Sequence, residues 1–222
     1  MLQEFDLPAR WTSLIQDYFS EAVHNLAQMW PDDQSLDISY RTIEGFDTEF
    51  AHDIVQNPDL HFHAANQALR QFLIDAGSPT MFPFVRINHL PSDQVRTVSQ
   101  LRADDIGQML ALDSVVTKIS GVRPRIYSAQ FECMACNHTM IINQPNEQEL
   151  IEPVECEQIT GGCGRAKRQT RFALNHKESI LINSQFIELQ ELPEQMKGGI
   201  QPERILCIGE HDLAGKLNPV IE

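Results

Sequence analysis

The sequence lacks several features that would place it directly in a functional class. No apolar run approaches the roughly 18 residues that a membrane-spanning helix needs, and the first residues carry no apolar segment typical of a signal peptide. There is no G-x-x-x-x-G-K-[ST] phosphate-binding loop, no H-E-x-x-H motif, and no motif of a Ser or Cys nucleophile. We therefore expect no membrane span, no ATP hydrolysis and no catalytic centre in these 222 residues.

Positive charge is scarce and unevenly distributed. The chain has 17 Lys and Arg against 31 Asp and Glu, a net charge of −14, which argues against nucleic acid because affinity for phosphate comes from cations. However, residues 1–93 carry 4 of the basic and 14 of the acidic residues, while eight basic residues lie between Lys118 and Lys177. The acidity belongs mainly to the first third of the chain, so the total charge does not exclude a basic surface in the rest.

The first third is predicted to be helical, with two short strands. Apolar residues follow helical spacing from Trp11 to Met29, from Phe46 to Ile54, and from Ala65 to Ala76. Asn57-Pro58 is expected to end the second helix, and Gly77 is well placed just after the third. Leu36, Ile38 and Tyr40 alternate as in a strand that could pair with residues 84–87.

From about residue 95 the sequence has the pattern typical of a small β-barrel or sandwich. Short segments rich in β-branched residues are separated by Gly, Pro and Asn, and the break before them lies near Leu90–Asp93. The predicted strands are residues 110–119, 125–132, 139–143, 171–174, 180–189 and 205–209.

Four of only five cysteines form two pairs, Cys133-x2-Cys136 and Cys156-x6-Cys163, separated by 19 residues. This pattern favours a structural zinc site, because four thiolates complete the tetrahedron that zinc prefers and leave no open position for catalysis. Two disulfides of a secreted protein are the alternative, although no secretory signal supports them. His138 could replace one ligand, and Cys207 is expected to be a buried core thiol.

Basic residues cluster at two places in this second part. Lys118, Arg123 and Arg125 flank a turn at Gly121, and further cations, Arg171 among them, follow the last cysteine. Such clusters on a small barrel suit a groove for single-stranded nucleic acid, in which Tyr127 and Phe131 either stack on bases or belong to the core.

Several short motifs occur in a characteristic order between residues 101 and 219. They are Leu101-Arg102, Ile106-Gly107, Val115–Lys118, Val122–Arg125, Phe131–Cys133, Leu189–Glu191, Gly198–Arg204, His211–Leu213 and Leu217–Pro219. In this order they resemble the N-terminal region of archaeal minichromosome maintenance (MCM) replicative helicases. The helical third is similar to that family only in length and placement.

The resemblance implies a multi-part α+β fold. Its parts would be an N-terminal helical subdomain (1–93), an OB-fold β-barrel (94–130 and 173–222), and a zinc-binding β subdomain inserted between barrel strands (131–172). The implied protein is cytoplasmic and nucleoid-associated if archaeal.

The resemblance also implies a function and its residues. This region would bind single-stranded DNA, with duplex DNA as a second candidate partner, and assemble into a hexamer or double hexamer around it. A separate AAA+ motor of the same protein would supply ATP and Mg²⁺ chemistry. Arg123 and Arg125 match the family's DNA-contacting positions, and Lys118 and Arg171 match more loosely. The segment 190–204, with Gln190, Glu191, Gln201 and Arg204, resembles the loop that relays between ring and motor.

Two departures from the family pattern leave alternatives open. The second cysteine pair is spaced more widely than usual, and the sequence ends where the family continues into a long basic hairpin. A free-standing single-stranded-DNA-binding OB-fold protein with a structural zinc is the main alternative. A protein-interaction module with an acidic docking surface is the third.

Overall fold

The computed structural model describes residues 6–78, 81–145, 149–192, 194 and 201–216. The chain divides into two compact units, Met1–Thr117 with Leu189–Ile205 and Lys118–Glu188 with Leu206–Glu222. Within the residues described, none of the helices combines the length and the apolar character that crossing a membrane requires.

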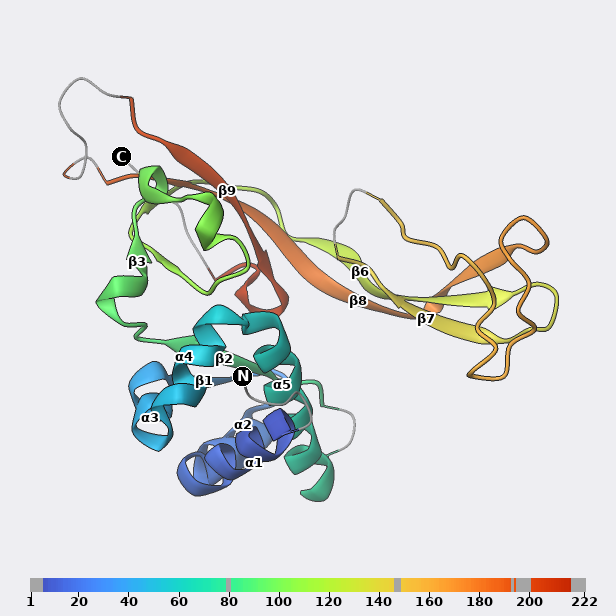
Figure 1. Cartoon of the computed structure of the whole chain (residues 1–222), viewed down its shortest axis with the longest axis horizontal. Helices are drawn as coiled ribbons and strands as arrows, with labels where there is room; N and C mark the ends of the chain where they lie inside the picture. Colours follow the sequence, from blue (N-terminus) through green and yellow to red (C-terminus); the bar gives the residue numbers. More distant parts are fainter. Residues whose placement is uncertain (1–5, 79–80, 146–148, 193, 195–200, 217–222) are drawn as a thin grey trace. The chain divides into compact units, whose positions relative to one another are not determined.

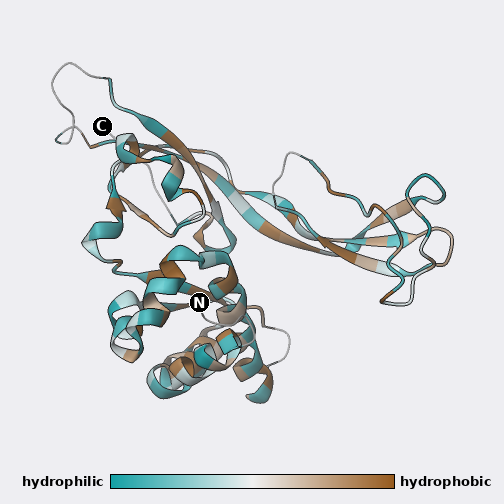
Figure 2. Ribbon diagram, in the orientation of Figure 1, coloured by the Kyte–Doolittle hydropathy of each residue, from teal (hydrophilic) through white to brown (hydrophobic). Residues whose placement is uncertain are grey.

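The first unit contains the helices (Figure 1), which are α1 (Leu7–Tyr18), α2 (Ser20–Met29), α3 (Tyr40–Phe46), α4 (Thr48–Gln56) and α5 (Pro58–Asp75). Each helix carries hydrophobic and hydrophilic residues side by side (Figure 2), as amphipathic helices do. Their apolar faces bury one core that includes Trp11, Phe50 and Leu69, all with no exposed surface. Burial of this apolar surface holds the helices together.

The helix ends follow local sequence signals. Helix α5 ends at the expected place: the N–H of Gly77, at φ 86°, donates to Ile74 O, and the N–H of Ser78 donates to Leu73 O. This is the pattern in which glycine adopts a left-handed conformation just after a helix. Helix α4 ends before Asn57-Pro58 as predicted.

Two helices are interrupted where the sequence predicts continuity. The segment 11–29 is two helices that meet at Phe19, whose backbone leaves the helical region. The second predicted helix is also two, because the Asp47 carboxylate accepts a hydrogen bond of 2.9 Å from Phe50 N and caps a new helix start.

The first unit also holds two small parallel sheets. Strand β1 (Ser35–Ser39) pairs with β2 (Phe84–Asn88), with Leu36 opposite Val85, so the predicted pairing is confirmed. Strand β3 (Val95–Arg96) pairs with β4 (Ala111–Leu112). The segment predicted as one strand over 110–119 is therefore interrupted, since β4 ends before β5 (Val115–Ile119) begins.

The remaining strands form a five-stranded sheet in the order β5-β8-β6-β7, with β9 paired to β8. They are β6 (Arg123–Cys133), β7 (Thr139–Asn143), β8 (Phe172–Gln190) and β9 (Arg204–Glu210). Strand β8 merges two predicted strands, and Figure 1 shows it as the long strand beside β6. Near the cysteine end of β6, the pair β6–β7 packs Cys133, Met140 and Cys156 into a small second core.

Candidate metal centre and nucleic-acid interface

The four paired cysteines converge in the second unit. Their sulfur atoms all lie within 4.8 Å of one another, with 3.8 Å between Cys133 Sγ and Cys163 Sγ and 3.7 Å between Cys136 Sγ and Cys156 Sγ. Tetrahedral coordination at about 2.3 Å from each thiolate separates the sulfurs by about 3.8 Å. The donor set and its spacing therefore fit one tetrahedral metal ion.

Local backbone structure positions both cysteine pairs. Strand β6 ends at Cys133, and a tight turn follows in which the N–H groups of Cys136 and Asn137 donate to Cys133 O. The second pair is joined by a loop in which Gly164 N donates to Cys156 O and Cys163 N donates to Cys156 Sγ at 3.3 Å. The wide x6 spacing is thus a compact loop whose two cysteines still meet.

Gly162 makes this close approach possible. A Cβ atom at this position would lie 2.5 Å from Cys156 Sγ and 2.5 Å from Glu157 O. Since real Cβ contacts are essentially never that short, any side chain here would displace the Cys156 sulfur or the Glu157 carbonyl.

Burial and hydrogen bonding set the acidity of the buried thiols. Burial raises the pKa of Cys156 to about 12. Burial also opposes ionisation of Cys133, but hydrogen bonds from the turn around Ala135 prevail and lower its pKa to about 6. A bound cation would favour the thiolate at both positions, because metal ligation requires deprotonated sulfur.

His138 and Cys207 do not join the cluster. His138 Nε2 lies 2.9 Å from Thr160 Oγ1, and the four cysteines alone satisfy the ligand geometry within the part of the chain described. Cys207 is half-buried on β9 rather than fully buried as predicted, because alternate residues of this strand are exposed.

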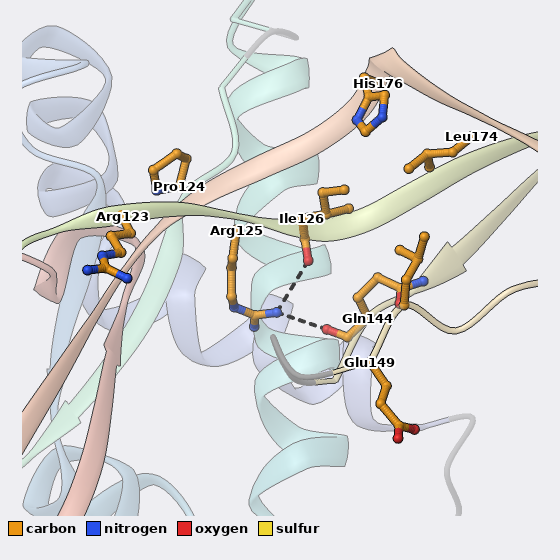
Figure 3. Close-up of a pocket in the computed structure, with 9 residues that line it drawn as sticks. Arg123, Pro124, Arg125, Ile126, Gln144, Glu149, Leu174 and His176 are labelled. Carbon is orange, nitrogen blue, oxygen red and sulfur yellow. Dashed lines mark hydrogen bonds between the residues drawn. The ribbon is translucent and has the colours of Figure 1, made fainter.

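Arg123 and Arg125 occupy alternate positions on β6 but have different surroundings. Arg125 is 8% exposed, and its guanidinium forms an ion pair of 2.5 Å with Glu210 Oε1 on β9. It also donates to Gln144 O at 2.9 Å and to Ile126 O at 3.4 Å (Figure 3). Arg125 therefore ties together β6, β9 and the residue that follows β7.

Arg123 is exposed at the start of β6. Among the described residues its guanidinium has no hydrogen bond or ion pair, and Figure 3 shows it lying apart from the Arg125 contacts. An exposed guanidinium without a carboxylate partner is available to a phosphate group.

The other predicted cations lie at the surface. The Lys118 side chain is 69% exposed and 3.7 Å from Glu188 Oε1, a distance at which the ion pair is weak. Arg171 is exposed just before β8, where its carbonyl accepts from Met134 N. Of the two aromatic residues, Phe131 is a core residue at 1% exposure, while Tyr127 is 41% exposed and packs edge-on against His211.

The ends of the segment 190–204 are joined at its base in the first unit. Glu191 N donates to Glu203 O at 3.2 Å, and Arg204 Nε donates to Gln190 Oε1 at 2.9 Å. Gln201 is exposed, and residues 193 and 195–200 lie outside the described part of the chain, as do Leu217–Pro219.

Glu191 fastens this base to the turn at residues 98–100. Its carboxylate, 7% exposed, accepts from Ser99 N at 2.9 Å and from Glu203 N at 3.4 Å. Hydrogen bonds from Ser99 lower the pKa of Glu191, so the carboxylate stays ionised.

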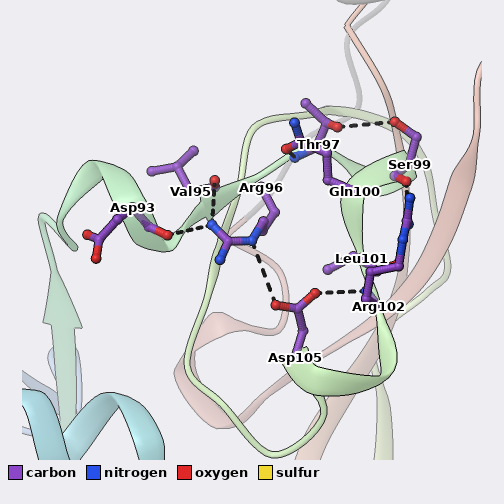
Figure 4. Close-up of polar contacts among 9 residues, drawn as sticks. All are labelled: Asp93, Val95, Arg96, Thr97, Ser99, Gln100, Leu101, Arg102 and Asp105. Atoms are coloured by element: carbon purple, nitrogen blue, oxygen red, sulfur yellow. Dashed lines mark hydrogen bonds and ion pairs between the residues drawn. The ribbon is translucent and has the colours of Figure 1, made fainter.

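The turn itself is held by the motif residues around Arg102 (Figure 4). Arg102 Nη1 donates to Ser99 O and Leu101 O at 2.7 Å each, and Arg102 N donates to Asp105 Oδ2 at 2.8 Å. The motif Leu101-Arg102 is therefore a structural support for the surface to which Glu191 binds.

The sequence model of the MCM OB domain matches residues 97–220, more than half of the chain. The chain belongs to the MCM family. The crystal structure of the N-terminal domain of an archaeal MCM superimposes with a TM-score of 0.78 and 28% identity, covering 98% of this chain and 85% of that one.

This structural match, with the cysteine cluster, confirms the predicted fold class: a helical subdomain, an OB-fold barrel and a metal-binding β subdomain inserted between its strands. Among curated MCM proteins, that of Saccharolobus solfataricus is 26% identical over 84% of this chain and 27% of its own length. MCM4 of Drosophila melanogaster is 21% identical over 90% of this chain and 22% of its own. The chain thus spans about a quarter of these relatives.

Sequence reasoning missed two residues of this interface. Glu210 directly follows the predicted strand 205–209, and no sequence signal indicated that its carboxylate would reach Arg125 of β6, because β9 pairs with β8. Gln144 is 3% exposed and had no signal in the sequence, because its role depends on where β7 ends.

Proposed function

We propose that the chain is the DNA-binding, ring-forming N-terminal region of a replicative MCM helicase, in which it holds single-stranded DNA for an ATP-driven AAA+ motor. Membership of the MCM family and the match to an archaeal MCM N-terminal domain support this assignment. The observation that carries the DNA-binding part is the exposed Arg123 guanidinium on β6, which has no carboxylate partner among the described residues.

In this proposal the basic residues have separate roles. Arg123 contacts a backbone phosphate, and Lys118 and Arg171 add weaker contacts from exposed positions. Arg125 holds the strand on which Arg123 stands, since its guanidinium is engaged by Glu210 and Gln144. We expect only the basic side chains that are not already paired with a carboxylate to release counterions when they bind DNA phosphates.

The cysteine cluster holds one structural Zn²⁺ ion. Four thiolates at tetrahedral spacing are the donor set that zinc prefers, and they leave no position for a reacting water. The metal stabilises residues 131–172, whose own apolar core among the described residues comprises Cys133, Met140, Cys156 and Phe172.

The chain assembles as a hexamer or double hexamer, and the three subdomains divide as 1–93, 94–130 with 173–222, and 131–172. The segment 190–204 relays between this ring and the motor, with Gln190, Glu191 and Arg204 at its base and Gln201 on the loop. The hydrogen bonds at the base of this loop support the proposal, because they hold its two ends together and attach them to Ser99.

Binding of a fluorescein-labelled thymidine 12-mer to the chain, measured by anisotropy across salt concentrations, tests the DNA-binding part. The wild-type chain is expected to bind at low salt, and Arg123→Ala to reduce the slope of log K against log [salt] by about one. Arg96→Ala is the matched control, because Arg96 lies in the first unit and already pairs with Asp105.

An affinity and slope that Arg123→Ala leaves unchanged would remove this residue from the interface. Light scattering tests the ring: particles of six or twelve chains support assembly, and a monomer at high protein concentration, with or without DNA, contradicts it.

A further inference from the structure

A cavity of 390 Å³ opens beside Arg123 and Arg125 in the second unit (Figure 3). Its apolar wall includes Ile126 of β6, Leu174 of β8 and Leu150. The polar groups of its lining, besides the two arginines, come from Gln144, Glu149 and His176. A mostly apolar cavity with a few converging polar groups is the usual form of a small-molecule site, and this volume lies within the usual range.

Gln144 builds one wall of the cavity. It is 3% exposed, its Nε2 donates to Ile151 O at 3.0 Å, and its Oε1 accepts from Ile151 N at 2.7 Å. This two-way contact fixes residue 151 and so holds the adjacent Leu150 against the cavity. Leu150 remains 45% exposed, an apolar surface that an occupant would cover.

An irregularity in β8 forms the part of the cavity where His176 lies. Ser128 of β6 pairs with Ile180, but Gln130 pairs with Asn175, so four residues of β8 stand opposite one residue of β6. The Ser179 hydroxyl donates to Asn175 O at 2.7 Å and accepts from Gln130 N at 3.0 Å, which stabilises the bulge. Bulges of this kind redirect side chains, and this one presents His176 to the cavity.

The chemistry of the cavity fits a nucleobase rather than a phosphate. Its apolar wall would desolvate an anion, whereas a base offers two apolar faces and a polar edge. His176 supplies a flat ring for stacking, and Arg123 at the mouth would hold the phosphate of the same nucleotide. A base of a single strand is free to turn into such a cavity, while a base in a duplex is already paired and stacked.

We propose that this cavity is a subsite for one unstacked nucleobase of the bound single strand, with Leu150, Leu174 and His176 contacting the base. The inference rests on the proposed single-stranded-DNA-binding function and adds that this interface reads bases as well as phosphates.

The test compares two 12-mers that have the same phosphates: a thymidine oligonucleotide and one in which every residue is an abasic tetrahydrofuran. Leu150→Ala and His176→Ala are expected to weaken binding of the thymidine oligonucleotide by about fivefold or more, the effect of losing one base contact. Neither variant should change binding of the abasic oligonucleotide. Arg123→Ala should weaken both, because it acts on phosphate.

Leu181→Ala is the matched control for Leu150→Ala, since Leu181 is 53% exposed and, although it lies on β8, does not line the cavity. It should leave both affinities unchanged. Lys177→Ala serves the same purpose for His176→Ala, because Lys177 is its neighbour in the bulge and does not line the cavity. Any effect of Lys177→Ala should be equal on the two oligonucleotides.

The outcomes separate the two proposals. If wild type binds the thymidine oligonucleotide and the cavity variants bind it equally well, the base subsite is overturned and the DNA-binding function stands. The subsite is also overturned if the variants weaken both oligonucleotides equally, since the change would then act on the backbone path. If wild type binds neither oligonucleotide at low salt, the DNA-binding function itself fails.

Discussion

Replacing Arg125 with alanine should destabilise the second unit by about 2–4 kcal/mol. The Arg125 side chain is 7% exposed, and its removal leaves the Glu210 carboxylate without its cation and Gln144 O without its donor. Breaking a buried ion pair costs about 3–5 kcal/mol, and orphaning a buried acceptor about 1–3. The Glu210 side chain is 31% exposed, so water recovers part of this cost, which places the expected loss below the sum.

The assay is guanidinium denaturation followed by far-UV circular dichroism. Tryptophan fluorescence would not serve, because Trp11 and Trp30 both belong to the first unit. Arg123→Ala is the internal control and should change stability by less than about 0.5 kcal/mol, since that side chain is exposed. The double variant Arg125→Ala, Glu210→Gln should be less destabilised than the sum of the single variants, because the two residues interact directly.

Two results would refute this reasoning. One is an Arg125→Ala chain as stable as wild type, which would mean that the pair with Glu210 contributes nothing. The other is an Arg123→Ala chain that is the less stable of the two. Either would return Arg125 to the set of residues that contact DNA directly.

Two further predictions concern the metal cluster and the helical core. Gly162→Ala should lower the metal content below one ion per chain, as measured by mass spectrometry, because the added Cβ would meet Cys156 Sγ. The control Gly121→Ala, which has open space around it, should leave the metal content unchanged. Burial lowers the pKa of His61 below its usual 6.5, so the unfolded chain binds a proton first as the pH falls. The stability of the first unit, followed by Trp11 fluorescence, should therefore decrease as the pH falls below about 6.5, and His61→Gln should flatten that decrease; a wild-type stability that is constant between pH 7 and 5 would contradict it.

Local sequence signals predicted the elements whose ends depend on nearby residues. Helix α5 ends at Gly77 and helix α4 before Pro58 because these residues control their own backbone. The interruption at Phe19 has no such signal, since neither Gly nor Pro stands there. The merger of two predicted strands into β8 also had no sequence signal, because the polar run at residues 175–179 forms a bulge. One hydrogen bond from Gln130 of β6 and several within β8 hold this bulge.

In the candidate site too, the features that depend on nearby residues could be predicted, and those that depend on contacts with distant strands could not. Cysteine spacing was enough to predict that the four cysteines converge, because two short-range pairs that serve one tetrahedral ion must bring their sulfur atoms together. The roles of Arg123 and Arg125 could not be separated in this way. They are two residues apart on one strand, and only the contacts of Arg125 with Glu210 of β9 and with Gln144, the residue after β7, make one of them a buried support.

Net charge is a poor guide to nucleic-acid binding in this chain because it does not show which basic residues are paired with a carboxylate and which are not. Lys167 pairs with Glu152 at 2.7 Å and Arg125 with Glu210, so several acidic residues in the second unit neutralise a neighbouring cation. Counterion release depends on the cations that remain without such partners, and Arg123 is one of these within the described residues. An acidic chain can therefore present a short cationic path, and the salt slope for DNA should count only its unpaired basic residues. Removing Glu210 while keeping Arg125 would test this directly: Glu210→Gln should raise the slope if the freed guanidinium reaches phosphate, and leave it unchanged if burial still keeps Arg125 from DNA.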